Sequence, residues 1–316
     1  MKTYYPSYYK SFRCIAGECP DSCCKSWEII IDKETLGKYE RLSGEFADKI
    51  RSSLTTDSDG DTCFVLNNGR CPFLNSDGLC DIHINLSEDF TSDICKKHPR
   101  FTEEYDSFTE ITLSLSCPEA NNIIFSDEIS SETYPVPEYN GDDEVLELLI
   151  NSRRSLLEEK CSFSELVKKL LETSADDSLD IDMVYIADFP EFDVSFIRNY
   201  ISCLKNNEIL TDEWKHILHS TVNNEISNEK IIIAVSDNES DLIKLCRYLI
   251  YRYYLKAVND LDIYSRALFI IASCFTCLYL SSVCDISFRE CARLYSKETE
   301  HNTENIDNIL DYFSNF

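Results

Sequence analysis

The order of apolar and polar positions divides the chain into a turn-rich first third and a helical remainder. Trp27 to Ile31 is a short apolar run with β-branched residues, which predicts a strand or an extended segment. Asp32 follows this run and can cap a helix that continues through Leu36 and Tyr39 to Leu42. The next stretch, from residue 60 to residue 80, contains two tight-turn signals, Asn67-Asn68-Gly69 and Ser76-Asp77-Gly78.

Helical patterns dominate after an acidic segment, residues 126–143, that contains Pro135, Pro137 and Gly141. The first predicted helix begins at Asp142 or Asp143. Its inward positions are Val145, Leu148, Leu149 and Leu156. Ser162 and Glu165 fit a capping box for the second. Further helices are expected over residues 240–255, 267–284, 288–301 and 306–313, while Ile231 to Ile233 fits either a helix or a strand.

We therefore predict a mainly α protein. Residues 1–125 would form a cysteine-rich, loop-rich metal domain with a short strand or hairpin. Residues 126–143 would be an acidic linker or surface loop, and residues 144–316 an α-helical domain.

One apolar segment is nearly long enough to cross a membrane. Residues 267–284 contain no charge, but they include four serine and threonine side chains and only just reach the required length. A buried core helix is therefore favoured over a membrane span. The first residues contain no apolar core of a secretory signal, so we expect a cytoplasmic protein.

The net charge is strongly acidic, with 30 Lys and Arg against 57 Asp and Glu, or −27. This charge argues against nucleic acid as a partner, because phosphate binding depends on basic patches. It is compatible with a basic partner or a lysine-bearing substrate, although an acidic surface also serves solubility alone.

The chain has sixteen cysteines, and eight of them form an ordered set within the first 117 residues. Without export, disulfides are not expected, and clustered cysteines indicate metal ligands or catalytic thiols. Iron–sulfur clusters usually take four thiolates, and zinc is the alternative, although its paired C-x2-C knuckles are absent. The candidate metal ligands are Cys14, Cys19, Cys23, Cys24, Cys71, Cys80, Cys95 and Cys117.

Other residues could add to this set. Cys23 and Cys24 are adjacent and point in different directions, so we do not expect the two to ligate the same iron. Cys63 could be an extra ligand but is favoured as a bystander, and His83 and His98 are favoured in supporting roles over replacing a thiolate. The remaining cysteines lie on apolar helical positions, where free cysteine acts as a small hydrophobe: Cys161, Cys203, Cys246, Cys274, Cys277, Cys284 and Cys291.

Several segments resemble the flagellin lysine-N-methylases (FliB family), within a wider group that has a CxxxCxxxCC-type zinc- or iron-chelating domain. They are Cys14 to Asp32, Cys71 to Leu74, Asp77 to His83, Cys95 with Pro99-Arg100, Leu115 to Ala120, Arg252 to Ala257 and Tyr295 to Asn302. The resemblance implies methylation of flagellin lysines with S-adenosylmethionine, and a [4Fe-4S] cluster in the cysteine domain. This chain departs from the family pattern at Cys63, which is an extra cysteine, and in the middle region, where the sequence is divergent.

Lysine methylation is a polar displacement by a neutral amine, so the enzyme must remove the ammonium proton and align the reacting atoms. Glu300 and His301 are the candidate proton-handling pair, unless they form a solvated helix end. Arg252 and Tyr254 are candidates for binding the carboxylate or adenine of the cofactor, unless they belong to the core. The competing hypothesis is a non-enzymatic zinc- or iron-binding or redox-sensing protein.

Overall fold

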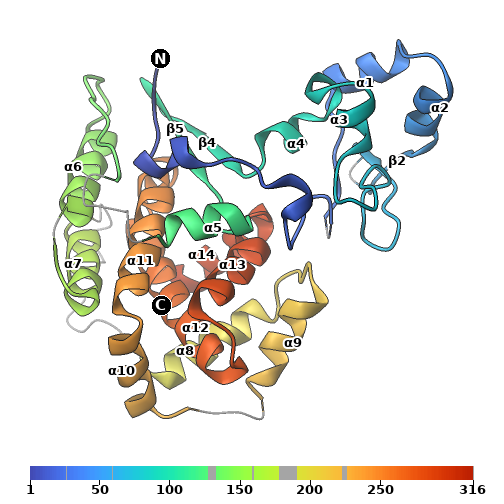
Figure 1. Ribbon diagram of the computed structural model, residues 1–316. Coiled ribbons are helices and arrows are strands. Elements are labelled where there is room, and N and C mark those ends of the chain that lie inside the picture. The colour runs from blue at the N-terminus through green and yellow to red at the C-terminus, as the bar shows by residue number, and fades with distance from the viewer. Residues whose placement is uncertain are drawn as a thin grey trace. The chain divides into compact units, whose positions relative to one another are not determined.

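The computed structural model describes residues 1–25, 27–58, 60–126, 133–158, 160–177, 191–222 and 226–315. Within these residues the protein is mainly α-helical, as predicted (Figure 1). The chain divides into two compact units. The cysteine unit comprises Arg13–Phe101 and Cys117–Glu119, and the helical unit comprises Met1–Phe12, Thr102–Ser116 and Ala120–Phe316.

The expected boundary at residues 126–143 coincides with none of the four points where the chain passes between these units. The reason is a sheet that the hydrophobic pattern did not predict. Strand β1 (Lys2–Tyr4) pairs in parallel with β5 (Phe108–Leu113), and β4 (Arg100–Glu104) lies on the other side of β5. Part of the expected linker, residues 127–132, lies outside the described residues.

The cysteine unit confirms the predicted extended segment and the helix that follows it. The backbone N–H of Ile31 donates to the carbonyl of Thr62 at 2.7 Å, so residues 29–31 run beside strand β3. Asp32 then caps α1 by accepting a hydrogen bond from the N–H of Thr35 at 2.9 Å. The elements of this unit are α1 (Lys33–Glu40), α2 (Glu45–Ser52), the antiparallel hairpin β2 (Leu54–Thr56) and β3 (Thr62–Phe64), α3 (Asp81–Asn85) and α4 (Asp93–Lys97).

The core of the cysteine unit is small and partly aromatic. The rings of Phe64 and Phe73 lie 4.9 Å apart, and Tyr39 stacks near Phe64 at 6.2 Å. Ile29, Ile31, Ile50, Cys71 and Ile82 complete the buried cluster. A bound metal would therefore add to the stability of this unit.

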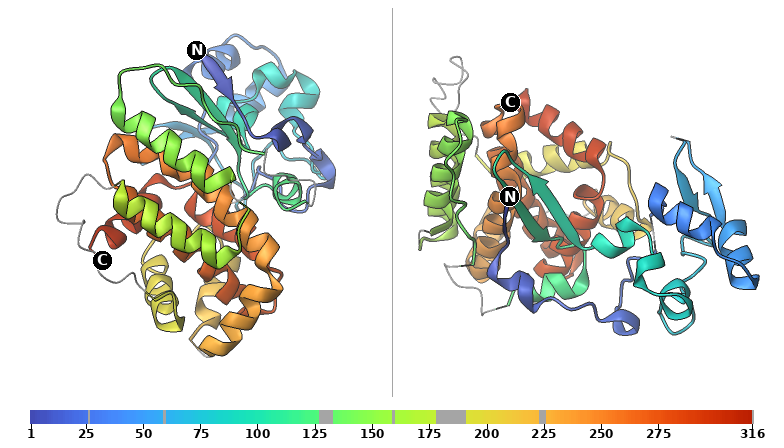
Figure 2. Two further views of the ribbon diagram at one scale, coloured as in Figure 1. Left: turned by 90° about the vertical axis from the view of Figure 1, so that its left-hand side faces the viewer. Right: turned by 90° about the horizontal axis from the view of Figure 1, so that it is seen from above.

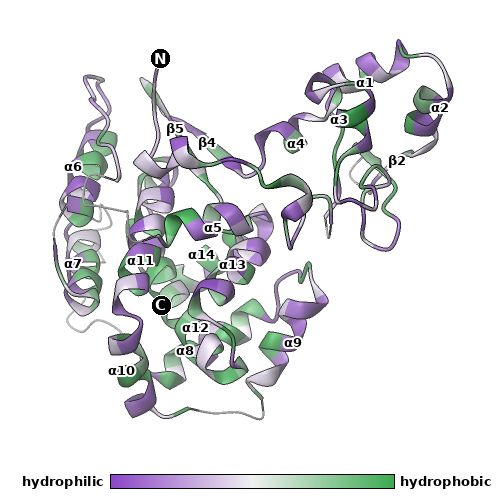
Figure 3. Cartoon of the chain, viewed as in Figure 1, coloured by the Kyte–Doolittle hydropathy of each residue, from purple (hydrophilic) through white to green (hydrophobic). Residues whose placement is uncertain are grey.

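The helical unit is organised around α12 (Ile263–Cys284). This helix packs against α7, α8, α11, α13 and α14. Figure 3 colours the helices of this unit by hydropathy, with hydrophobic residues in green. It is long and apolar enough to cross a bilayer by composition, but 78% of its apolar window is buried within the protein. The predicted buried core helix is therefore confirmed.

The other helices of this unit surround α12 or extend from it. Figure 2 shows α6 and α7 side by side, in agreement with their contacts. Their bounds are α5 (Pro118–Ile124), α6 (Glu144–Glu158), α7 (Phe163–Asp176), α8 (Val194–Leu204), α9 (Asp212–Ser220), α10 (Asn228–Asp237), α11 (Glu239–Tyr253), α13 (Phe288–Thr299) and α14 (Thr303–Ser314).

Three local expectations have different outcomes. The capping box at α7 is present, since Ser162 and Glu165 exchange side-chain and backbone hydrogen bonds. In α6 the predicted inward position of Leu148 is wrong, because that residue is 37% exposed. Arg153 is buried there instead. The ambiguous segment Ile231 to Ile233 is helical, in α10.

Candidate metal centre and candidate active site

Four of the eight predicted metal ligands lie within electrostatic range of one another. Burial raises the pKa of the Cys71 thiol to about 12, and nearby Cys24 and Cys80 contribute to the increase. Burial also raises the pKa of Cys95, with contributions from Cys24, Cys71 and Cys80. Cys24 likewise raises the pKa of Cys80, after the effect of burial. In every pair among Cys24, Cys71, Cys80 and Cys95, at least one thiol thus raises the pKa of the other.

The backbone turns of this region hold the thiols in place. The N–H of Cys71 donates to the carbonyl of Cys24 at 2.9 Å, which joins the two cysteine-bearing segments. Backbone groups of Phe73 and Leu74 hydrogen-bond the Cys71 thiol and oppose the rise in its pKa. Ile82 and His83 do the same for Cys80. Hydrogen bonds of this kind favour the thiolate, the form that ligates a metal.

The other four predicted cysteines are placed as follows. Cys23 is a near neighbour of Cys24, Cys95 and Cys14, and a hydrogen bond from Cys23 lowers the pKa of Cys24 to about 7. Cys14 is exposed, and its sulfur accepts from the N–H of Ala16 at 3.4 Å. Cys19 donates to the carbonyl of Asp21 at 3.3 Å, and Cys117 belongs to the same unit.

Two glycines bring the first cysteine loop against the second. Gly17 lies between Cys14 and Cys19, and a Cβ added there would be 2.5 Å from the carbonyl oxygen of Asp77. Gly78 has a φ of +73°, and a Cβ there would be 3.2 Å from the Cα of Gly17. The close backbone contact therefore requires glycine on both sides.

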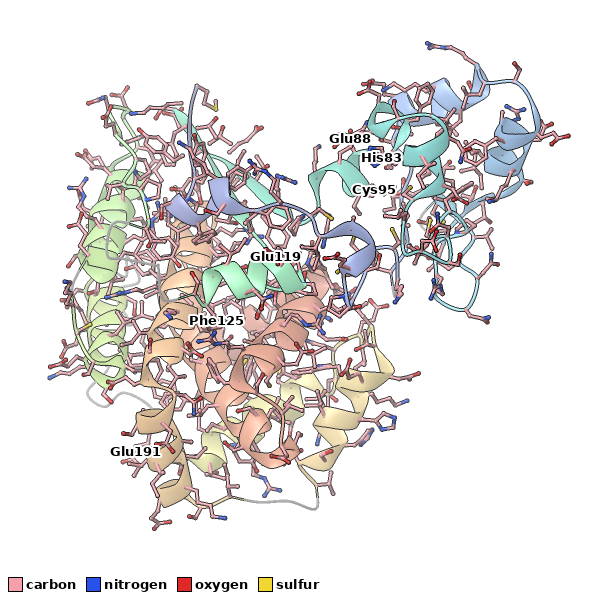
Figure 4. The ribbon with its side chains drawn as sticks, in the orientation of Figure 1. His83, Glu88, Cys95, Glu119, Phe125 and Glu191 are labelled. Atoms are coloured by element: carbon pink, nitrogen blue, oxygen red, sulfur yellow. The ribbon has the colours of Figure 1, made fainter. Side chains whose placement is uncertain are left out.

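The cysteine unit contains two histidines, His83 and His98. His83 is exposed on α3, and Figure 4 labels it together with Cys95 on α4. The His98 ring lies 5.4 Å from that of Trp27. Tyr39 is closer to the thiols, since burial and then Cys95, Cys80 and Cys71 raise its pKa.

Cys24, Cys71, Cys80 and Cys95 together offer four sulfurs, the ligand number of either a [4Fe-4S] cluster or tetrahedral zinc. Among the described residues, no three of these sulfurs lie within 4.8 Å of one another. The thiols would therefore have to move closer together to reach the spacing of about 3.8 Å that tetrahedral zinc requires. A bound cation would offset the repulsion among these thiolates.

The helical unit contains a separate buried polar cluster around Glu300, which follows α13. The Glu300 carboxylate accepts hydrogen bonds from Tyr248 at 2.9 and 3.1 Å, from Tyr253 at 3.1 Å and from Ser296. Its side chain is 2% exposed. The alternative of a solvated helix end is therefore wrong for Glu300.

Arg252 connects this carboxylate to the sheet. Its Nε lies 3.8 Å from Glu300, and its Nη1 pairs with Glu103 of β4. Glu103 also pairs with Lys256 at 2.6 Å. Burial opposes the charge of Arg252, but Tyr253, Glu300 and Glu103 outweigh it and raise the pKa of the guanidinium. Glu103, with a side chain 29% exposed, is the part of this group nearest to solvent.

His301 lies beside the Glu300 cluster but contacts other side chains. Its Nε2 is 3.0 Å from the Ser114 hydroxyl and 2.8 Å from that of Ser116, and the residue is half-buried. Ser114 is also 3.4 Å from Ser296, which donates to Glu300. The two predicted proton-handling residues are thus linked through serines.

The two predicted cofactor-binding residues do not share a site. The hydroxyl of Tyr254 donates to Asp177 at 3.0 Å, whereas Arg252 is engaged with Glu103 and Glu300. Tyr254 is fully buried, so the alternative that it belongs to the core holds for this residue. Sequence reasoning missed Glu103 and Tyr248, because nothing in their local sequence indicates contact with the end of α13.

The fold and these clusters define a mainly α-helical protein with an inserted cysteine-rich unit. Comparison with characterised proteins gives its relatives. No protein-family model matches the chain, and no solved structure matches it. Flagellar biosynthetic protein FliU of Salmonella muenchen is 31% identical over 134 residues, which cover 39% of this chain and 76% of that protein.

Lysine-N-methylases of Salmonella typhimurium and Salmonella choleraesuis are also 31% identical over 134 residues. The match spans 39% of this chain but only 32% of each methylase. The chain belongs to the family of FliU and these lysine-N-methylases.

Proposed function

We propose that this protein is an S-adenosylmethionine-dependent protein-lysine N-methyltransferase that acts on flagellin. The observation that carries the proposal is its membership of a family in which two relatives are named lysine-N-methylase and one is named a flagellar biosynthetic protein. The strongly acidic chain, with a net charge of −27, is compatible with a lysine-bearing protein substrate.

We further propose that the cysteine unit holds a [4Fe-4S] cluster, with zinc as the alternative, through Cys24, Cys71, Cys80 and Cys95. The mutual coupling of these four thiols supports this ligand set. The bound centre would connect residues distant in sequence and so stabilise a unit with a small core. Because an amine is already a nucleophile, the reaction requires no radical, so the centre would either be structural or help to hold the cofactor.

S-adenosylmethionine would supply an electrophilic methyl group. The residues of the chain must then desolvate the lysine amine and accept its proton. Both oxygens of Glu300 are occupied by the hydroxyls of Tyr248 and Tyr253. His301 is half-buried and held by two serines, so it is the member of the pair that can meet a substrate. We therefore assign proton transfer to His301 and its positioning to Glu300, Ser114 and Ser116.

The enzymatic part is tested by incubating flagellin with the anaerobically purified protein and S-adenosylmethionine, followed by mass spectrometry of the lysines. The proposal expects methyl-sized mass increments with the wild type and a loss of at least about 100-fold in rate with His301→Ala. His216→Ala, in the exposed part of α9, is the matched control. Metal binding without methylation of any lysine would favour the non-enzymatic alternative.

The metal part is tested separately by iron, sulfide and zinc analysis of the same preparation. Serine at each of Cys24, Cys71, Cys80 and Cys95 should lower the metal content, and Cys161→Ser, in the helical unit, should not. Retention of the full metal content by all four single variants would refute this ligand set. A preparation that contains zinc but no iron would show that the centre is the zinc alternative and not a [4Fe-4S] cluster.

A further inference from the structure

A second group of metal-binding side chains lies on the β2–β3 hairpin of the cysteine unit. One carboxylate oxygen each of Glu28 and Asp57 and the sulfur of Cys63 all lie within 4.8 Å of one another. This group is distinct from the four cysteines, Cys24, Cys71, Cys80 and Cys95, proposed above as metal ligands. They come from separate segments: the extended run before α1, the residue that follows β2, and β3.

The strand pairing explains why these side chains meet. Cys63 is opposite Thr55 of β2 and opposite Ile30 on its other side. Side chains alternate between the two faces of a strand, so residues two positions away share a face. Asp57 is two residues beyond Thr55, and Glu28 is two residues before Ile30. The pleat therefore directs all three donor groups to one face.

This face is the one that points away from the core. Ile29, Ile31 and Phe64 alternate with these positions and belong to the apolar cluster of the unit. On the outer face, Ile30 is 40% exposed and Thr55 is exposed, yet Cys63 between them is only 2% exposed. Cys63 is therefore not an ordinary core cysteine.

The Cys63 thiol has no hydrogen-bond partner within the described part of the chain, although it faces two carboxylates. Burial raises its pKa, and Glu28, Asp57 and Asp61 raise it further. The neighbouring carboxylates disfavour the Cys63 thiolate, so without a cation the group stays a neutral thiol. A divalent cation would reverse this, because it stabilises the thiolate and the carboxylates together.

We propose that Glu28, Asp57 and Cys63 form a second metal site, which takes zinc or another divalent transition ion of similar ligand preference. One sulfur and two carboxylate oxygens are accepted donors for zinc, whereas magnesium and calcium prefer oxygen alone. In a tetrahedral site with bonds of about 2.0–2.3 Å, donor atoms lie about 3.3–3.8 Å apart. The exposed Glu28 side chain can rotate to reach this spacing, and water would complete the coordination.

The site can be tested with Co2+, which reports a thiolate ligand through a charge-transfer absorption band. The full-length protein, purified anaerobically with its first centre intact, is titrated with Co2+ and followed by difference spectra. The wild type should bind one additional equivalent and develop the band, and Zn2+ should displace it. Cys63→Ser should lose the band and the additional equivalent.

Glu28→Gln and Asp57→Asn should keep the band but weaken Co2+ binding by at least about tenfold, the lower end of what even supporting residues contribute. Because Glu28 is exposed, its variant tests the site without disturbing the fold. Glu40→Gln, on the exposed end of α1, and Cys161→Ser are matched controls that should bind as the wild type does. The proposal is overturned if the wild type shows no additional thiolate band, or if Cys63→Ser retains it.

Discussion

The buried ion pair between Arg153 of α6 and Glu110 of β5 offers a sharp test of what holds the helical unit together. The guanidinium donates two hydrogen bonds to the carboxylate, at 2.8 and 2.5 Å, and a third to the carbonyl of Tyr251 at 3.0 Å. The two side chains are 2% and 3% exposed. Replacing Arg153 with methionine keeps most of the volume but leaves a buried carboxylate without its partner.

The expected loss is large. Breaking a buried ion pair by removing one partner costs about 3–5 kcal/mol, which is a large share of the 5–15 kcal/mol that stabilises a typical domain. The lost stacking of the guanidinium on Tyr251, at 4.5 Å from the ring centre, adds to this cost. Replacing both partners with methionine removes the unpaired charge, so the double variant should lie within about 1–2 kcal/mol of the wild type.

Urea denaturation followed by far-UV circular dichroism measures these differences, because most of the helical signal comes from this unit. The refuting result is a loss below about 1 kcal/mol in Arg153→Met, or single losses that simply add in the double variant. Either result would mean that the carboxylate is hydrated or finds another donor, so that the pair does not anchor α6 to the sheet.

Three further outcomes are expected. Burial opposes the charge of Glu103, but Arg252 and then Lys256 lower its pKa. Its stabilisation is therefore present above the unfolded value of about 4.3 and is lost as pH falls through the folded value. Glu103→Gln should cost about 1.5–3 kcal/mol at neutral pH and flatten that acid dependence in denaturation curves. Ser162→Ala should lower the stability of the helical unit by about 1 kcal/mol through loss of the α7 cap, and an unchanged urea midpoint would contradict this. Gly17→Ala should reduce metal retention during dialysis against a chelator, whereas Gly37→Ala, whose added Cβ would meet only Arg41 at 3.8 Å, should not.

Local signals in the sequence predicted local structure well. The Asp32 cap and the Ser162–Glu165 box each depend on residues three positions apart, so the chain near them contains the whole interaction. The long apolar pattern of α12 likewise required only its own composition. These predictions succeeded because their physical causes are short-range.

The predictions that failed depended on distant partners. Arg153 lies on a helix whose apolar pattern favours Leu148 inward, and only Glu110, in a strand far away in sequence, makes a buried arginine stable. Strand β1 has three residues and acquires its pairing from β5. In the metal region, sequence supplied eight candidate cysteines, but the turns that couple four of them could not be read from spacing alone. The same holds for Cys63, whose neighbours are set by strand register.

The insertion of the cysteine unit between β1 and β5 has a consequence for the order in which the protein can come apart. Because β1 and β5 pair within the helical unit, the intervening chain is a closed loop even when the cysteine unit is unfolded. Closing a flexible loop of roughly ninety residues costs on the order of 4 kcal/mol, and this cost grows only slowly with length. The helical unit can therefore tolerate the melting of its insertion. A fragment that begins after residue 12, in contrast, lacks an edge strand of its sheet, so the first dozen residues belong to the fold of the last two hundred.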